Sequence, residues 1–525
     1  MRTHLPFAVV SLLAAAPVWA QAPADAPAEV TPVVVVTPAP VVIVTDGKAM
    51  PVPKVAPWLH ADYALLAAGA KTTSFAVDAT GAKAPDDPEL LARLRVKLSF
   101  DSAEHWAAFG IQGAAGTELQ QSHAFGPTLP GDRLPGAQTP LDQAYQPTEG
   151  WLGATLGKAA TVRAGLMGSH WGLGLLANDG AIDQTSSNWF VVPRLGDRVT
   201  RAALVLTPWR GTDSPLRGLV VSAAMDQVYA DDVLLPGDTA RQMVGAVKLY
   251  TAPDQWFGLY VAKRDQHNLA DRGINVTAID AAADYALTPK WGSLRLQAEA
   301  AMVMGTTTLG ATPDHVSHDV QQGAAMARAT AKTEAGMQAQ LDVAWMSGDK
   351  TLEDGKVTAF RADPNLQFGL ILFPRVLAYQ SGRARLRASD PQLIGTPAED
   401  LDRLATGGSI SSAVLLYPKV GQAFADHGEV YGGVLLALAP SPLADPRSSR
   451  TAGGGQPFNY LGNAPDGLAL GTEINFGVRG TWMLPEIGRT MLGVEGATLM
   501  PGGVLNGLSG PIYAGRVVLE VRNVR

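Results

Sequence analysis

The chain has 525 residues, of which 46% are hydrophobic and 17% charged, with 56 Gly, 37 Pro and no Cys. This apolar content excludes an intrinsically disordered chain. The formal net charge of −7 gives no electrostatic reason to expect a nucleic-acid partner. The absence of Cys excludes disulfides, thiolate metal sites and a Cys nucleophile.

The first residues, MRTHLPFAVVSLLAAAPVWA, have the pattern of a secretory signal peptide over 1–20. Arg2 precedes an apolar run from Leu5 to Ala16, and Val18 and Ala20 occupy the positions that precede a cleavage site. An N-terminal membrane anchor is the alternative, but the apolar run is short for a span. Residues 21–57, rich in Pro, Val and Ala, predict an extended periplasmic tether. No later run is long and apolar enough for a membrane-spanning helix.

The stretch LARLRVKLSF, residues 91–100, alternates cations with aliphatic side chains. Arg93, Arg95 and Lys97 recur at every second position, which is the period of a β-strand with one basic and one apolar face. Taken alone, this strand also fits a water-soluble sandwich. The rest of the chain decides between the two.

The same alternation returns along the chain and predicts an all-β protein over 58–525, a transmembrane antiparallel β-barrel of about eighteen strands. The strand lengths suit tilted membrane strands, which need about 9–11 residues. The expected strands span 58–68, 91–100, 105–116, 150–157, 161–168, 198–208, 216–227, 240–251, 255–265, 276–287, 291–305, 323–333, 335–347, 410–418, 427–439, 468–482, 488–499 and 511–524.

The connections between these strands alternate between long and short, as periplasmic turns and outer loops of a membrane barrel do. The segment YPKVGQAFAD, residues 417–426, is among the expected short turns. Six Trp lie at the first strand or at short turns, which predicts an aromatic girdle at the membrane interface. They are Trp58, Trp106, Trp209, Trp256, Trp291 and Trp482.

The polar face of each strand supplies the expected lumen lining, because a charge facing hydrocarbon costs about 2–4 kcal/mol at mid-membrane. Two interpretations remain open: a basic lumen that favours anions, or a wall of Arg–carboxylate pairs that neutralises itself. The expected lining residues are Arg93, Arg95, Lys97, Arg163, Arg201, Lys248, Arg295, Glu299, Arg328, Asp342, Glu473, Arg479, Glu495, Arg516 and Glu520; the same parity adds Asp62, Asp226, Asp280, Asp284, Arg264, Lys332 and Arg522.

Two expected outer loops are unusually apolar. In 168–197, the side chains of His170, Asn178, Asp179 and Asp183 match no calcium-loop spacing, so no metal is expected. The loop 348–409 contains FGLILFPRVLAYQ, in which Pro374 argues against a long helix. Such apolar runs should not face bulk water. For 168–197, a constriction inside the lumen and packing across its mouth both remain open. For 348–409, an inward plug, an extra hairpin and a partner-binding surface all remain open.

The stretch LGTEINFGVRGTWMLPEIGRTMLGVEGATLMPGG, residues 470–503, resembles the closing hairpin of alginate-export-type and related substrate-specific porins. WMSGDK, residues 345–350, resembles a strand-to-loop transition of such porins, and the layout is similar to that of porin-like proteins of myxobacteria. The resemblance implies passage of polysaccharide or small anions, with six residues facing the channel: Arg93, Arg95, Lys97, Glu473, Arg479 and Glu495. Such barrels usually end in an aromatic residue that the insertion machinery recognises, whereas this chain ends in Arg525.

Together these patterns favour a porin-like channel of the bacterial outer membrane for small polar solutes, with anionic solutes as one option. A plugged structural or surface-interaction barrel with partner-binding outer loops is the alternative. An enzyme is not expected: His60 and Asp62 share a strand face but lie at its periplasmic end, and no G-x-S-x-G motif occurs. The expected partners are outer-membrane lipid, the barrel-insertion machinery and small polar solutes, with no cofactor and no nucleic acid.

Overall fold

The computed structural model describes residues 59–86, 88–102, 109–123, 145–157, 159–180, 188–192, 194–310, 314–350, 354–389, 406–445, 448–449 and 457–523. The signal peptide and tether predicted for residues 1–57 lie outside these ranges, as do Trp58 and Trp106.

The described chain consists mainly of β-strands. They are β1 (Leu59–Thr72), β2 (Glu89–Asp101), β3 (Phe109–His123), β4 (Tyr145–Leu156), β5 (Ala160–Gly168), β6 (Arg198–Leu206), β7 (Leu219–Ala230), β8 (Thr239–Ala252), β9 (Gln255–His267), β10 (Gly273–Leu287), β11 (Gly292–Thr307), β12 (His318–Thr333), β13 (Met337–Met346), β14 (Lys356–Val357), β15 (Val414–Phe424), β16 (Gly428–Leu438), β17 (Ala469–Leu484), β18 (Gly488–Pro501) and β19 (Ile512–Arg522).

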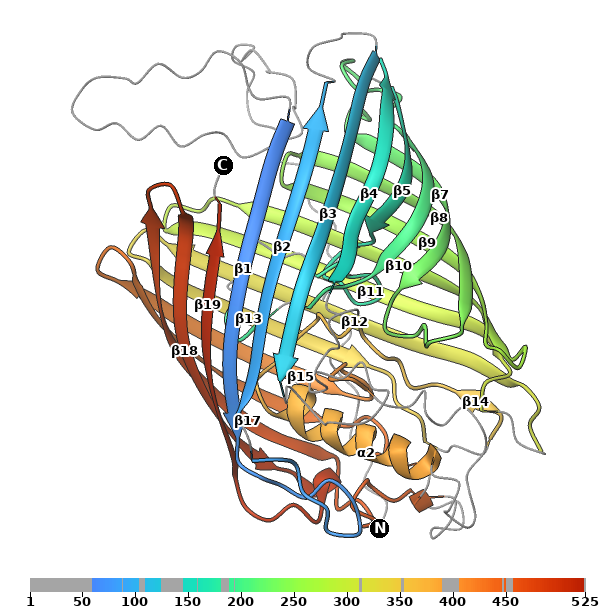
Figure 1. Ribbon diagram of the computed structural model, residues 1–525, viewed down its shortest axis with the longest axis vertical. Coiled ribbons are helices and arrows are strands. Elements are labelled where there is room, and N and C mark those ends of the chain that lie inside the picture. Colours follow the sequence, from blue (N-terminus) through green and yellow to red (C-terminus); the bar gives the residue numbers. More distant parts are fainter. Residues whose placement is uncertain are drawn as a thin grey trace, which may run out of the picture. The chain divides into compact units, whose positions relative to one another are not determined.

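The strands form one closed antiparallel ring (Figure 1). Each pairs with its neighbours along the chain, and β1 pairs with β19 from Ala64 opposite Arg522 to Thr72 opposite Ala514. The short β14 pairs in parallel with β12 and is not a member of the ring, because β13 pairs directly with β15. The remaining eighteen strands form the barrel that the sequence predicted. Closure leaves no strand edge unpaired.

Long and short connections alternate around the ring, with one reversal. The connection 207–218, on the side of the short connections, is longer than the next connection along the chain, 231–238, on the opposite side. We call the two ends of the barrel the short-connection end and the long-connection end.

One predicted turn is wrong, because β15 continues from Val414 to Phe424 through the segment YPKVGQAF. The alternation explains this: Leu416 and Val420 are exposed, whereas Tyr417 and Lys419 are buried. Pro418 remains opposite Leu341 of β13. Because proline has no backbone N–H, it cannot donate a hydrogen bond to a neighbouring strand. The pairing of β15 with β16 accordingly skips this position.

The two faces of each strand differ sharply in exposure, as β17 illustrates. Ile474, Phe476 and Val478 are 42%, 63% and 44% exposed, whereas Glu473 and Asn475 are 0% and 1% exposed. Because the ring is closed, one face of each strand looks inside it, and the buried polar face is that inner face. Apolar side chains therefore cover the outside of the barrel.

The predicted aromatic girdle is wrong for Trp256. Trp209, Trp291 and Trp482 are exposed near short connections. Trp256 instead packs against Trp171, with ring centroids 5.7 Å apart. Alternation alone assigns Trp256 to the inner face, opposite the neighbouring Phe257, which is exposed.

The expectation that Pro374 prevents a long helix is also wrong. The turn η1 (Leu372–Leu377) continues directly into α2 (Ala378–Ser389), and a short 3-10 turn, η3 (Gly503–Leu505), precedes β19. Pro374 lies in the first turn of this helical segment, where a backbone N–H would lack an intrahelical partner anyway. No helix within the described ranges is long and apolar enough to cross a membrane.

Candidate functional site

The described part of the connection between β5 and β6, residues 169–180, 188–192 and 194–197, folds against the inner face of the wall. We call these residues the first inner segment. Glu299 of β11 accepts hydrogen bonds from the backbone N–H groups of Leu173 and Leu175, the latter at 3.1 Å. The indole N–H of Trp171 donates to Asp280 Oδ1 at 3.1 Å. Glu299 is therefore buried beneath this segment.

A second inner segment, which consists of the described residues 358–389 and 406–413, is held by Glu473 of β17. This carboxylate accepts the backbone N–H groups of Leu370, Ile371 and Leu372 at 2.5, 3.1 and 2.8 Å. These residues lie where η1 begins, so their N–H groups have no partner within the helical segment. A buried carboxylate suits this position, since the N-terminus of a helix carries partial positive charge.

The same helical segment also contacts the wall across the β1–β19 seam, through Glu89 of β2. Arg375 forms an ion pair with Glu89, and the Tyr379 hydroxyl donates to it at 2.8 Å. Burial lowers the pKa of Arg375 to about 10, which still leaves the guanidinium charged near neutral pH. The Tyr379 ring also meets the edge of Phe75 at 5.8 Å.

Glu495 of β18 connects wall and first inner segment through an aromatic cluster. It accepts the Phe190 N–H at 3.1 Å and the Tyr431 hydroxyl at 2.9 Å, and Arg516 donates to it at 2.8 Å. Trp189 stacks on Tyr431 with centroids 5.4 Å apart. Phe190 has φ of 66°, a left-handed conformation that costs a bulky residue about 1–3 kcal/mol. The contacts must outweigh that strain.

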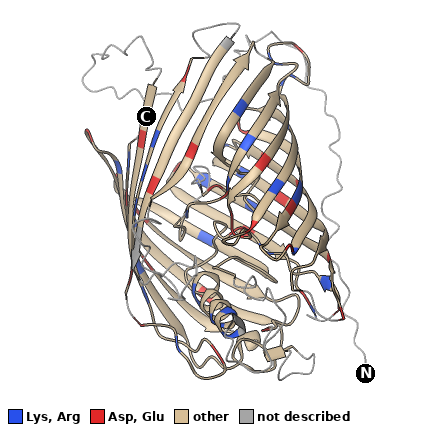
Figure 2. Ribbon diagram, turned by 45° about the vertical axis from the view of Figure 1, so that its right-hand side comes forward, with Lys and Arg blue, Asp and Glu red and all other residues tan. Residues whose placement is uncertain are grey.

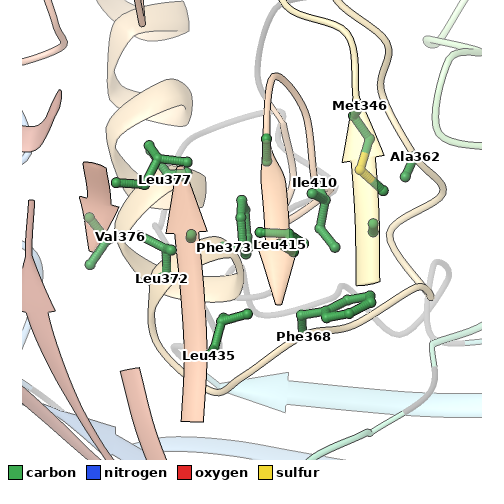
Figure 3. Packing of buried hydrophobic residues seen from close by; sticks show 14 of the residues in the cluster. Met346, Ala362, Phe368, Leu372, Phe373, Val376, Leu377, Ile410, Leu415 and Leu435 are labelled. Atoms are coloured by element: carbon green, nitrogen blue, oxygen red, sulfur yellow. The ribbon is translucent and has the colours of Figure 1, made fainter. Parts of the chain in front are cut away.

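An apolar core fills the space between the inner segments and part of the wall (Figure 3). Phe368, Phe373 and Ile410 of the second inner segment pack with Leu415 of β15 and Leu435 of β16, and all five are almost completely buried. Each such side chain contributes about 1.5–3 kcal/mol when removed from water. The inner segments are therefore packed structure inside the ring.

Four aspartates lie close together where both inner segments meet the connection 231–238. This aspartate cluster consists of Asp197, Asp231, Asp232 and Asp363. Asp231 pairs with Arg264 of β9 at 2.5 Å. The Asp197 side chain accepts the backbone N–H of Asn178 at 3.2 Å, and no carboxylate–cation pair involves it within the described residues. The cluster thus holds more acid groups than arginines can neutralise.

Burial makes this cluster sensitive to protonation. Burial, together with the nearby Asp232 and Asp231, raises the pKa of Asp363 to about 8, against a hydrogen bond from the Asn365 N–H. Burial, Asp363 and Asp231 likewise raise the pKa of Asp197 well above its usual value. Near neutral pH the Asp363 carboxyl group therefore retains its proton.

Most other predicted lining residues form ion pairs along the inner face. Figure 2 shows basic and acidic residues distributed over the strands of the wall. The carboxylate–cation pairs favour a self-neutralising wall. They are Arg93 and Arg95 with Glu118 (3.6 and 2.8 Å), Lys97 with Glu149 (3.0 Å), Arg201 with Asp226 (2.7 Å), Arg295 with Asp284 (2.7 Å), Arg328 with Asp342 (2.6 Å), Lys419 with Asp342 (2.9 Å), Arg479 with Glu429 (2.5 Å), Arg516 with Glu495 (2.8 Å) and Arg522 with Glu520 (3.5 Å).

Two predicted lining cations contact aromatic rings instead. Arg163 lies 4.9 Å from the centre of the Trp151 ring and donates to Gln112 Oε1 at 3.1 Å. Lys248 Nζ lies 4.0 Å from the Trp256 ring and 4.6 Å from Trp171. Cation–π contact orients these side chains without cancelling their charge.

Several functional partners missed by the sequence analysis lie just outside the predicted strands. Glu89, Glu118, Glu149 and Lys419 each extend the inner-face alternation by one or two positions beyond an expected strand end. Continuing the period of two would have found all four. No group of three or more His, Asp or Glu that could hold a metal ion occurs among the residues that the structure describes.

Comparison with known proteins gives only distant likenesses. No family model and no curated protein matches the chain. Solved structures with similar folds include three proteins of Pseudomonas aeruginosa: OccK11 (OpdR), with 10% identity over 89% of this chain and 96% of that chain at a TM-score of 0.47; the outer membrane protein OpdK, with 11% identity over 88% and 98% at 0.47; and OccK2 (OpdF) in complex with glucuronate, with 10% identity over 89% and 98% at 0.48. These values do not establish a shared family.

Replacing Glu473 should loosen the second inner segment. In Glu473→Gln one acceptor oxygen becomes a donor that faces three backbone donors, so we expect a loss of about 2–3 kcal/mol in the free energy of unfolding. Faster proteolytic cleavage within 358–378 should accompany it. Glu149→Gln, which changes a wall carboxylate that contacts neither inner segment, is the matched control. Equal protease resistance of both variants would contradict the anchoring role.

The aspartate cluster should make the fold less stable as pH rises. Because the folded pKa of Asp363 is raised, its contribution is full below about pH 4 and is lost as pH rises to about 8. The thermal unfolding midpoint should therefore fall between pH 5 and pH 8. Asp363→Asn should flatten this dependence, whereas Asp354→Asn, at an exposed position, should leave it unchanged. A wild-type midpoint that rises over this range would refute the assignment.

Proposed function

We propose that the protein is a porin-like channel of the bacterial outer membrane, through which small polar solutes diffuse. The observation that supports this best is the closed ring of eighteen strands with a charged inner face and an apolar outer face. A ring of this size encloses water unless other segments fill it. The inner segments narrow that space to a path along the remaining charged wall.

The outer face supports a location in lipid. Large apolar residues are exposed on strand after strand, among them Leu152, Met225, Phe257, Phe476 and Val494. Soluble proteins rarely expose contiguous apolar areas of this extent. A bilayer satisfies such a surface, and the signal peptide predicted at 1–20 agrees with export to the outer membrane.

A preference for anions is part of the proposal. On the wall formed by β2 to β5, the side chains of Lys97 and Arg95 are 39% and 31% exposed, and Arg163 is also exposed. Their carboxylate partners are less exposed: Glu118, which pairs with Arg95, is 2% exposed, and Glu149, which pairs with Lys97, is 18% exposed. A passing solute therefore meets cations first. Exposed Arg and Lys in a pore favour anions.

A plugged barrel is the second candidate, and the apolar core between the inner segments and the wall favours it. If that core leaves no continuous water path, the outer connections would serve a surface partner. Conductance separates the two candidates.

The membrane location predicts opposite effects for charges on the two faces. Val494→Lys places a charge on the outer face and should lower the free energy of unfolding from vesicles by about 2–4 kcal/mol if the site lies near mid-membrane. Thr155→Lys, at a partly exposed inner position, should change it by less than about 1 kcal/mol. Equal losses would argue against a lipid-facing outer surface.

The channel function predicts an open conductance in planar bilayers. In a KCl gradient the reversal potential of the refolded protein should indicate anion preference. Lys97→Gln with Arg163→Gln should move the permeability ratio towards unity, because two exposed lining charges are lost. Arg217→Gln, in the exposed connection 207–218, is the control.

A silent barrel that is inserted and folded would favour the plugged alternative. An open channel that prefers cations would contradict the proposed anion preference and leave the channel function intact.

A further inference from the structure

Two cations lie on the outer face of the barrel, near the long-connection end. Lys263 of β9 alternates with the buried Ala262 and shares the outer face with Val261, which is 36% exposed. Arg241 of β8 likewise shares the outer face with Met243, which is 59% exposed. Both cationic side chains are exposed. They therefore point away from the lumen, towards the surroundings of the barrel.

The strand register places Lys263 among apolar neighbours. On one side it pairs with Met243 of β8, and on the other with Thr277 of β10. Thr277 pairs in turn with Met304 of β11, which is 38% exposed on the outer face. Lys263 thus lies at the border of the apolar outer surface, level with side chains that would contact lipid.

Arg241 lies two residues closer to the long-connection end than Met243. Its register partners are Asp265 of β9 and Gln227 of β7. Two residues beyond Gln227, the side chain of Tyr229 is 47% exposed on the outer face. Tyr side chains on the outside of a membrane barrel favour the membrane–water interface. Arg241 therefore lies at the depth of the lipid headgroups.

Neither cation has a carboxylate partner among the described residues. Arg241 Nε donates to the amide oxygen of Gln227 at 3.4 Å, and Lys263 donates to the amide oxygen of Asn275. The neighbouring Asp265 contacts His267 Nε2 at 2.7 Å and accepts a hydrogen bond from Asn275 Nδ2 at 3.0 Å. The positive charge of Arg241 and Lys263 is therefore left for an anion from outside the chain.

We propose that Arg241 and Lys263 form a binding site for the phosphate group of a membrane lipid in the leaflet at the long-connection end. Arg donates two parallel hydrogen bonds to a phosphate, and Lys adds a point charge. The long side chains keep their charges at the headgroups while Val261 and Met243 contact the acyl chains. The border position favours a lipid over a soluble anion. The inference rests on the membrane location that is part of the proposed function.

Titration of the folded, detergent-solubilised protein with dilauroyl phosphatidic acid tests the site. Native mass spectrometry counts the bound lipids and gives the dissociation constant. In the double variant Arg241→Gln with Lys263→Gln we expect the affinity for the first lipid to fall about ten-fold, since two cation–phosphate contacts are lost. Arg241→Lys with Lys263→Arg, which keeps both charges, should bind within about three-fold of the wild type.

Lys350→Gln with Lys356→Gln is the matched control, because it removes the same charge from exposed positions of the connection between β13 and β15. Its lipid affinity should stay within about two-fold of the wild-type value. The thermal unfolding midpoint checks that each variant is folded. Unchanged lipid binding in the folded Arg241→Gln, Lys263→Gln variant, or an equal loss in the control, overturns the proposal.

Two further outcomes would assign these residues to another partner and overturn the lipid site. One is displacement of the lipid by inorganic phosphate at an equal concentration, which would indicate a site for a soluble anion. The other is a lipid-free dimer that the double variant abolishes, which would indicate contact with a second copy of the chain.

The conductance measurement separates this inference from the channel function. Lipid binding that depends on Arg241 and Lys263, in a barrel without conductance, supports the lipid site and refutes the channel. An open channel whose lipid binding is the same in the double variant refutes the lipid site alone.

Discussion

Buried polar groups inside this barrel need partners, and wall carboxylates supply them to the backbone of the inner segments. Glu299, Glu473 and Glu495 accept backbone N–H groups from segments that fold inwards. Either side alone would be costly, because a buried charge without a partner and an unpaired N–H both lose their hydration. Their pairing lets a charged wall hold an apolar core. Other parts of the interior, including the aspartate cluster, depend on where these carboxylates place the inner segments.

Charge balance inside the ring is local. Along most of the wall each guanidinium has a carboxylate within ion-pair distance, so the net charge of −7 says little about the interior. The aspartate cluster departs from this balance. Burial and neighbouring aspartates raise the pKa of Asp363 to about 8, so this carboxyl group retains its proton near neutral pH. The pKa of Asp197 is raised well above its usual value for the same reasons.

The strands were predictable because lipid on one side and water or protein on the other impose a period of two over the whole chain. The ends of the strands were less predictable, which is why Glu89, Glu118 and Lys419 were missed as ion-pair partners. The inner segments were beyond prediction for another reason. Their apolar composition indicated burial but could not show which wall residues would receive them. Glu473 was predicted to face solute, yet it binds three backbone N–H groups.

The helical segment η1–α2 binds Glu89 near the start of the barrel and Glu473 near its end. These anchors are far apart in sequence but close to the β1–β19 seam that closes the ring. Such non-local contacts form slowly, because the entropy of a long loop must be lost first. The interior would therefore assemble after the first and last strands meet. Until then the apolar side chains of the second inner segment would remain exposed, a hazard for aggregation during biogenesis.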